Sequence, residues 1–206
     1  MCKKIYVTGI GTDVGKTVVS AIVTEALSAD YWKPIQAGDT TFGDTEKVKA
    51  LISNSTSTFF PNAYLLNTPM SPHAAAEIDN IVIDINTILA PKTENTLVIE
   101  GAGGLLVPLN DKETILDTID VSYKVILVSR HYLGSINHTL MSLKILMDRG
   151  HDVSIIFNGD ENSTTENIIS KMTGVKLIGR IDEEANLTKD IITKYAKRFK
   201  ENLQNI

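Results

Sequence analysis

Disulfide chemistry is excluded for this chain, because its 206 residues include a single cysteine, Cys2. A lone thiol suits a reducing compartment, so we expect a cytoplasmic protein. Long hydrophobic runs are also missing, since no segment approaches the roughly 20 apolar residues that span a bilayer. The apolar run behind Lys3 and Lys4 stops at Thr8, too early for a signal peptide. These absences predict a soluble, unprocessed protein without a membrane partner.

An excess of positive charge is missing as well. The chain carries 20 Lys and Arg residues against 25 Asp and Glu residues, a formal net charge of −5. It therefore has no general attraction for phosphate backbones, and we expect no nucleic-acid partner. Hydrophobic residues make up 43% and charged residues 22% of the chain, as in ordinary globular proteins. Without a linker rich in Pro, Gly or Ser, residues 1–206 are expected to form one domain.

Short apolar runs rich in Val and Ile alternate with longer segments of helical periodicity. Buried strands separated by helices predict an α/β fold with a mostly parallel sheet and helices on both faces. Ligands of such sheets bind at the carboxyl ends of the strands. The longest irregular stretch, 53–72, is interpreted as a functional loop. The predicted strands are 4–8, 31–36, 96–99, 124–129, 153–157 and 176–178, and the predicted helices are 15–28, 44–52, 135–149, 164–172 and 187–203.

A glycine-containing turn, 8–17, follows the first predicted strand and opens the first predicted helix. Phosphate oxygens need closely spaced N–H donors, and Gly11 and Gly15 leave the backbone free to supply them at a helix N-terminus. Lys16 can reach the β- and γ-phosphates, and the Thr17 hydroxyl can ligate Mg²⁺. The turn therefore predicts a P-loop fold that binds ATP with Mg²⁺.

Two residues of this turn depart from the common pattern. Ile10 stands where the first glycine of the motif belongs, and Gly9 lies one residue too early. Asp13 places a carboxylate near the phosphates, which needs a compensating cation. At ~4 Å and an effective dielectric constant near 20, unlike charges attract by about 4 kcal/mol before desolvation. A substrate amine or a metal ion can compensate Asp13, and a solvated turn residue is the alternative interpretation.

A second acid stands at the end of another predicted strand. Glu100 closes the apolar run 96–99 and is followed by Gly101, Ala102, Gly103 and Gly104. In P-loop enzymes an acid at this place holds Mg²⁺ directly or through water. The glycines permit close approach of a ligand to the backbone. An ordinary β-turn is the alternative, but it requires neither the acid nor so many glycines.

Four further segments of the chain complete the pattern. Together with the two motifs, and in the same order along the chain, they resemble segments of the ATP-dependent dethiobiotin synthetase family. The matches run from Thr8 to about Asn158. The resemblance implies that ATP, CO₂ and 7,8-diaminononanoate react to dethiobiotin through a carbamate, which is phosphorylated and then closed into a cyclic urea. The four segments are Trp32-Lys33-Pro34-Ile35-Gln36-Ala37-Gly38, Ser71-Pro72-His73-Ala74-Ala75, Val107-Pro108-Leu109 and Leu133-Gly134-Ser135-Ile136-Asn137-His138.

The resemblance also assigns roles to the matched positions. Lys33 becomes the principal catalytic side chain, assisted by Lys16, and Asp13 could hold a substrate amine. The implied Mg²⁺ ligands are Thr17, Asp44 and Glu100. The implied nucleotide-binding residues are Asp13, Val14, Gly15, Lys16, Thr17, Val18, Asp44, Glu100, Gly101, Ala102, Gly103 and, for the base, Asn158. The implied substrate-binding residues are Asp13, Lys33, Ala37, Ser71, Pro72 and Asn137.

Some of these assignments leave alternatives open. Asp39 competes with Asp44 as a metal ligand, and Asp44 is preferred because it stands where an N-cap would start the helix 46–52. Asn137 implies a homodimer, because in the family the substrate carboxylate docks at this helix start of a partner subunit; alternatively, Asn137 caps its own helix.

Other positions test how far the resemblance extends. His73 and His138 are interpreted as packing or hydrogen-bonding residues rather than as acid–base catalysts, although histidine titrates near neutral pH. Ala37 replaces a frequent serine and Asp182 a proline of the family pattern. These two departures leave the base preference and the fine substrate contacts open.

Two other functions are compatible with the same fold. A dimeric ATPase switch of the partition or division-site type can end in a membrane-binding amphipathic helix, and the C-terminal segment has an apolar stripe. We prefer a packed terminal helix, which has the same pattern. A cobyrinate-type amidase would need a glutaminase domain with a catalytic Cys, which this chain lacks. The stripe comprises Leu187, Ile191, Ile192, Tyr195, Phe199 and Leu203.

Overall fold

A central parallel sheet organises the computed structural model, which describes residues 2–206. Within this range the main sheet has seven strands in the order β4-β2-β6-β1-β7-β8-β9, and neighbouring strands pair in parallel. The expected parallel α/β architecture is confirmed. The strands are β1 Lys4–Gly9, β2 Asp30–Trp32, β4 Phe59–Phe60, β6 Leu97–Gly104, β7 Lys124–Arg130, β8 Asp152–Asn158 and β9 Lys176–Ile181.

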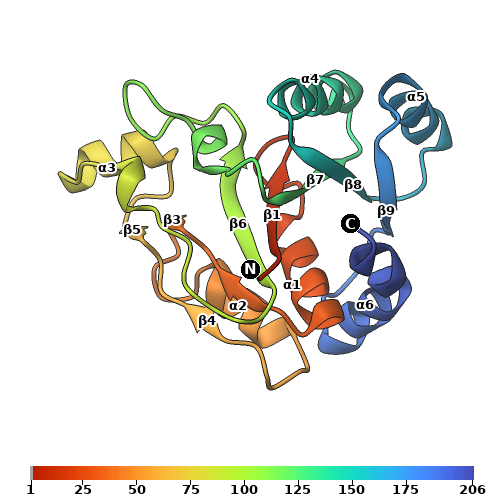
Figure 1. Ribbon diagram of the computed structural model, residues 1–206, viewed down its shortest axis with the longest axis horizontal. Coiled ribbons are helices and arrows are strands. Elements are labelled where there is room, and N and C mark those ends of the chain that lie inside the picture. The colour runs from red at the N-terminus through yellow and green to blue at the C-terminus, as the bar shows by residue number, and fades with distance from the viewer. Residues whose placement is uncertain (1) are drawn as a thin grey trace.

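Helices cover both faces of this sheet (Figure 1). α1 (Lys16–Leu27), α2 (Asp44–Leu51) and α6 (Lys189–Gln204) share one apolar core with the sheet. Successive strand residues face opposite sides, so in β1 Ile5 and Val7 enter this core and Tyr6 enters the other. The second core also receives side chains of α3 (Pro72–Asp79), α4 (Ser135–Asp148) and α5 (Ser163–Thr173).

The predicted strand 31–36 is wrong as a single element. It divides into β2 in the main sheet and β3 (Ile35–Ala37), which pairs with β5 (Tyr64–Leu66) in a separate two-stranded sheet. The division falls at Lys33 and Pro34, because proline has no N–H for a sheet ladder and the Lys33 side chain turns into the protein interior.

The predicted loop 53–72 is irregular only in part, because it contains β4 and β5. α3 then begins at Pro72, whose fixed φ suits the first turn of a helix. Two short 3₁₀ helices, Ile85–Thr87 and Ile115–Thr118, complete the described elements.

The C-terminal apolar stripe belongs to the core except at Leu187, which precedes α6 and is 45% exposed. Ile192, Tyr195, Phe199 and Leu203 of α6 are buried in the same cluster as the α1 side chains. Burying a large apolar side chain contributes about 1.5–3 kcal/mol, so this face holds α6 against the domain. The expectation of a packed terminal helix is confirmed. No helix within residues 2–206 has the length and apolar character required to cross a membrane.

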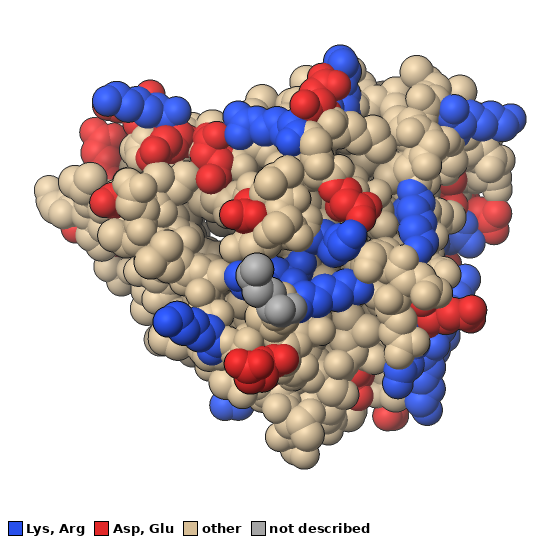
Figure 2. All heavy atoms as spheres, viewed as in Figure 1, with Lys and Arg blue, Asp and Glu red and all other residues tan. Residues whose placement is uncertain are grey.

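Acidic and basic side chains are interspersed over the face shown in Figure 2, with basic side chains gathered around the N-terminus. Lys4, Lys124 and Lys176 begin β1, β7 and β9, so they mark the amino ends of the strands. Burial, together with the nearby Lys124 and Lys176, lowers the pKa of Lys3. This basic edge lies opposite the carboxyl ends of the strands.

Candidate active site

A cavity of about 740 Å³ opens at the carboxyl ends of the central strands. The turn after β1 forms its middle, and the ends of β6 and β8 form its walls. The residues expected from the sequence that line the cavity are Asp13, Gly15, Lys16, Thr17, Val18, Lys33, Ala37, Asp44, Ser71, Pro72, Glu100, Ala102, Gly103 and Asn158. Most of the predicted site is therefore brought together in one place.

The phosphate loop connects β1 to α1. Gly15 is the N-cap of α1 with φ +96°, a conformation that favours glycine. A Cβ atom at Gly15 would lie 2.3 Å from Nδ2 of Asn158, so the close approach also requires glycine. Asn158 Nδ2 donates to the Val14 carbonyl at 2.9 Å. Val14 is itself buried under the loop, which explains why this predicted nucleotide residue does not line the cavity.

Ile10 occupies the position of the first motif glycine without disturbing the loop. Its N–H donates to the Val128 carbonyl of β7 at 3.1 Å, and its side chain packs against both apolar cores. Position 10 is therefore bound to the sheet. A Cβ atom at Gly11, the next residue, would meet nothing within 4 Å.

Lys16 folds back over the loop and donates from Nζ to the Gly11 carbonyl at 2.8 Å. Burial, with the positive charge of Lys33 nearby, lowers the pKa of Lys16 to about 8. An arriving triphosphate would favour the charged form of this lysine. Asp13 is exposed, lies in the left-handed region at φ 56° and faces the same cavity.

Glu100 is the centre of a buried polar cluster and is 1% exposed. Its Oε1 accepts from Thr17 Oγ1 at 2.9 Å and from Lys33 Nζ at 3.1 Å. Its Oε2 accepts from the Tyr31 hydroxyl at 2.9 Å. Lys33 Nζ also donates to the carbonyl of Gly101 at 3.1 Å. Gly101 thus contributes to the cluster through its backbone and is not part of the cavity lining.

Lys33 joins Glu100 to the second acid of the cluster, Asp44. Its Nζ lies 2.8 Å from Asp44 Oδ2. Burial alone would lower the pKa of Lys33, but Glu100 and Asp44 together raise it above its ordinary value. Burial likewise opposes ionisation of Asp44, but Lys33 holds the pKa of that carboxyl below its ordinary value. The cluster is therefore a charged ion-pair network.

The structure distinguishes Asp44 from Asp39. The Asp39 side chain is 67% exposed and pairs with Lys47 on the surface, whereas Asp44 lines the cavity. The expected N-cap role of Asp44 is wrong by one residue. Gly43 is the N-cap of α2, and the N–H of Asp44 donates to Gln36 Oε1 at 3.1 Å. The Asp44 carboxylate does not cap the helix and instead pairs with Lys33.

The donor atoms around Lys33 fit a hard divalent cation. Thr17, Asp44 and Glu100 offer one hydroxyl and two carboxylates, and Mg²⁺ prefers oxygen ligands. Within residues 2–206 no group of three or more His, Cys, Asp or Glu side chains could hold a metal ion. Mg²⁺ would therefore complete its coordination with water and substrate phosphates, as it usually does.

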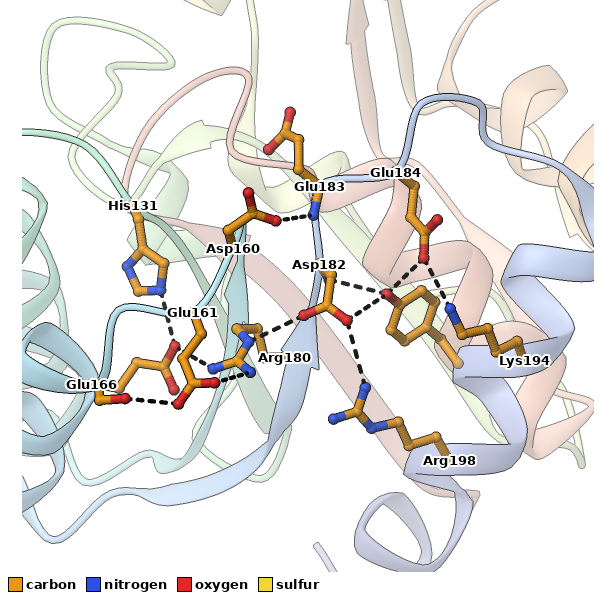
Figure 3. A network of polar contacts seen from close by, with 12 residues as sticks. His131, Asp160, Glu161, Glu166, Arg180, Asp182, Glu183, Glu184, Lys194 and Arg198 are labelled. Carbon is orange, nitrogen blue, oxygen red and sulfur yellow. Dashed lines mark hydrogen bonds and ion pairs between the residues drawn. The ribbon is translucent and has the colours of Figure 1, made fainter.

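One end of the cavity extends beyond Asn158 to the segment after β9. Ile181, Asp182, Glu183 and Glu184 line this end. Polar contacts from several elements hold the segment in place (Figure 3). The Asp182 N–H donates to the Tyr195 hydroxyl at 3.0 Å, and that hydroxyl is 2.8 Å from Glu184 Oε1. The buried α6 therefore positions this wall of the cavity.

Arg180 supports the same wall from β9. Its guanidinium reaches Asp182 at 3.2 Å, Glu166 at 3.0 Å and Glu161 at 3.3 Å (Figure 3). His131 also contacts Glu166, with 3.1 Å between Nε2 and Oε1. These contacts connect α5 and β9 behind the cavity.

Arg130 closes the same end from the carboxyl end of β7. Its guanidinium lies 3.0 Å from Glu183 Oε1, and both residues line the cavity. This ion pair connects the end of β7 with the segment after β9.

The other end of the cavity is formed by Ile35, Ala37, Ser71, Pro72 and Val107. Ser71 Oγ lies 3.1 Å from the ring nitrogen Nδ1 of His73. The backbone N–H of His73 donates to the Pro108 carbonyl. His138 similarly lies 2.7 Å from the Tyr132 hydroxyl. These bonds agree with the interpretation that both histidines are hydrogen-bonding residues.

Asn137 does not enter this cavity. It lies exposed in the first turn of α4, and among residues 2–206 its side chain has no hydrogen-bond partner. The alternative in which Asn137 caps its own helix therefore has no support.

The sequence analysis missed several residues of the site. Tyr31 contacts Glu100 from β2, and no local motif marks it, because the contact depends on the pairing of β2 with β6. Gln36, Arg130, Glu183 and Leu187 also line the cavity. Gln36 stands within the segment 32–38 that carries the family resemblance, whereas Arg130, Glu183 and Leu187 carry no local motif and come together only through tertiary packing.

Comparisons with known proteins concern the whole chain. A family model described as an AAA domain matches residues 3–190. The ATP-dependent dethiobiotin synthetase BioD of Christiangramia forsetii is 60% identical over 207 residues and covers 100% of both chains. The BioD protein of Cytophaga hutchinsonii is 47% identical over 97% of this chain and 98% of its own.

Solved structures share the fold at low sequence identity. A plasmid partition protein of Borrelia burgdorferi bound to AMPPNP matches with a TM-score of 0.61 at 15% identity, covering 100% of this chain and 99% of its own. The cell division ATPase MinD of Pyrococcus furiosus has a TM-score of 0.58 at 14% identity, covering 98% and 100%. These matches confirm the P-loop fold alone, and the much higher identity to synthetases disfavours the partition-type alternative.

Proposed function

This chain belongs to the ATP-dependent dethiobiotin synthetase family, and we propose that its cavity converts 7,8-diaminononanoate and CO₂ to dethiobiotin with ATP. One observation carries the proposal more than any other. Lys33 Nζ stands within 3.1 Å of two carboxylates and beside the phosphate loop, where phosphoryl transfer needs cations.

The reaction brings negative groups together. A carbamate oxygen forms a bond to the γ-phosphorus while the bond from that phosphorus to the bridging oxygen of ADP breaks. The second amine then attacks the carbamate carbon, phosphate leaves, and a proton is lost from the new urea nitrogen. Lys16 and Lys33 supply the positive charge that lowers the repulsion between carbamate and triphosphate. Asp13 binds a substrate amine, and Ala37, Ser71 and Pro72 line the diamine end.

Thr17, Asp44 and Glu100 are the residues that would hold Mg²⁺. The ion would neutralise charge on the β- and γ-phosphates when it is bound. We assign Asn158 to the base, and its place in the cavity lining beside the phosphate loop supports the assignment. We place the reaction in the cytoplasm, where ATP is available and the Cys2 thiol remains reduced.

A homodimer completes the site in this proposal, with Asn137 and the start of α4 of one subunit binding the substrate carboxylate in the other. The surface around Asn137 supports it. Leu133 is fully exposed and Tyr132, Ile136 and Met141 are each at least 36% exposed, and apolar side chains gathered in this way favour a protein interface. Leu133→Asp is expected to shift the mass measured by light scattering from dimer to monomer. A monomeric wild-type protein at micromolar concentration would contradict the proposal.

The activity is tested directly. Purified protein supplied with the diamine, bicarbonate, Mg²⁺ and ATP should release phosphate and form dethiobiotin in equal amounts, measured by mass spectrometry. Lys33→Ala and Lys16→Ala should each lose activity by orders of magnitude. Lys144→Ala removes an exposed lysine that pairs with Asp148 and does not line the cavity, and it is the control. Absence of dethiobiotin from the wild-type reaction would overturn the proposed function.

A further inference from the structure

Tyr31 lies directly behind the acid at the centre of the site. Its hydroxyl donates to Glu100 Oε2 at 2.9 Å, and the two residues are 0% and 1% exposed. β2 pairs with β6 so that Tyr31 stands beside Val98, two residues before Glu100. The ring also packs near Phe59, with 5.9 Å between ring centroids.

The two oxygens of Glu100 have different partners. Oε2 accepts a hydrogen bond from Tyr31, whereas Oε1 accepts from Thr17 Oγ1 at 2.9 Å and from Lys33 Nζ at 3.1 Å. Thr17 and Lys33 both line the cavity, and Tyr31 does not. The terminal torsion of a glutamate has a broad preference, so a carboxylate without a fixed partner can rotate. The Tyr31 hydroxyl is the contact that distinguishes the inner oxygen from the outer one.

We propose that Tyr31 is a positioning residue, which fixes the Glu100 carboxylate so that Oε1 alone faces the cation that accompanies the nucleotide. This inference rests on the proposed function, because it takes Glu100 as a ligand of Mg²⁺. Partners that orient a ligand commonly change metal affinity by about 10- to 100-fold. Loss of the hydroxyl would leave Oε2 free to turn toward Lys33.

The test is the Mg²⁺ dependence of ADP binding in Tyr31→Phe, which keeps the buried ring and removes the hydroxyl. ADP affinity is measured by calorimetry without metal and at increasing Mg²⁺ concentrations. We expect metal-free ADP to bind as in the wild type, and the Mg²⁺ concentration for half-maximal enhancement to rise by about 10- to 100-fold. A purely structural hydroxyl would alter thermal unfolding and leave this concentration unchanged.

Tyr6→Phe is the matched control. Tyr6 is also buried, but its hydroxyl bonds to Thr118 Oγ1 at 3.0 Å rather than to Glu100. This variant should lose a comparable hydrogen bond and keep the wild-type Mg²⁺ dependence. Equal weakening in both variants would overturn the inference, because the effect would then follow from loss of any buried hydroxyl.

A double-mutant cycle with Glu100→Gln supplies an independent measurement. If Tyr31 acts through Glu100, adding Tyr31→Phe to Glu100→Gln should not weaken the Mg²⁺ dependence further. Additive effects would overturn the inference. Dethiobiotin formation by the wild type separates this result from the proposed function, since a normal Mg²⁺ dependence in Tyr31→Phe refutes only the role of Tyr31. If the ADP affinity of the wild type did not depend on Mg²⁺, both the metal assignment and the role of Tyr31 would be refuted.

Discussion

Replacing Lys33 by methionine tests the charge balance of the site without relying on catalysis. Methionine is of similar length but carries no charge. The substitution leaves Asp44 and Glu100 without the Nζ that lies 2.8 and 3.1 Å from them. Removing one partner of a buried ion pair typically costs about 3–5 kcal/mol, because the remaining charge stays buried. For a chain of this size, that loss corresponds to a fall in melting temperature of roughly 6–20 °C.

The loss of unfolding free energy in Lys33→Met should depend on pH and become smaller as the pH falls. In the wild type Lys33 holds the pKa of Asp44 below its ordinary value, so this pair contributes stability at neutral pH and loses it as pH falls through the lowered pKa. In Lys33→Met the half-buried Asp44 carboxylate has lost its main counter-charge, and its pKa should rise. The difference in unfolding free energy between the two proteins should therefore be largest near neutral pH and shrink on acidification.

Mg²⁺ should partly replace the missing charge in the variant. Binding at a concentration 100-fold above its dissociation constant stabilises a folded protein by about 2.7 kcal/mol. The nucleotide-free wild type should respond less, because Lys33 already occupies the two carboxylates. Denaturant unfolding with and without Mg²⁺ measures both effects.

Lys47→Met provides the control for Lys33→Met, since its partly exposed pairs with Asp39 and Asp44 should change stability by only about 0.5 kcal/mol. A Lys33→Met protein as stable as the wild type at neutral pH, and indifferent to Mg²⁺, would refute the reasoning.

Three further predictions concern nucleotide binding. Gly15→Ala should weaken ADP binding at least about tenfold by calorimetry, because φ +96° and the 2.3 Å approach to Asn158 leave no room for a methyl group. The pKa of Lys16 is about 8 in the free protein, so the lysine loses its proton above that pH. ATP affinity should then fall by up to about tenfold per pH unit. In Lys16→Met this pH dependence should disappear. Tyr195→Phe should raise the KM for ATP several-fold and leave the KM for the diamine unchanged in steady-state assays, because its hydroxyl holds the cavity wall at Asp182 and Glu184.

The phosphate loop could be predicted because its chemistry is local. Gly15, Lys16 and Thr17 are adjacent in the chain, and a strand before them with a helix after them is enough to direct N–H groups and a lysine at one point. The ends of consecutive parallel strands meet at one edge, so Glu100 and Asn158 could also be assigned to the same site. Hydrophobic periodicity predicted the sheet and most helices for the same local reason.

Short elements could not be predicted in this way. β4 and β5 have two and three residues, too few for a period to be visible, and they form because partner strands lie beside them. The break at Lys33 and Pro34 is different, because a proline disfavours a continuous central strand and is visible in the sequence.

The chain alone therefore determined the parallel fold, the triphosphate site and its lysines, because each depends on neighbours along the backbone or on strand order. Tertiary structure decided which acid meets Lys33, which hydroxyl holds Glu100 and which wall closes the far end of the cavity. Asp44, Tyr31 and Tyr195 acquire these roles from partners that are distant in the chain, as Tyr31 is from Glu100, and only packing of the folded domain sets their distances.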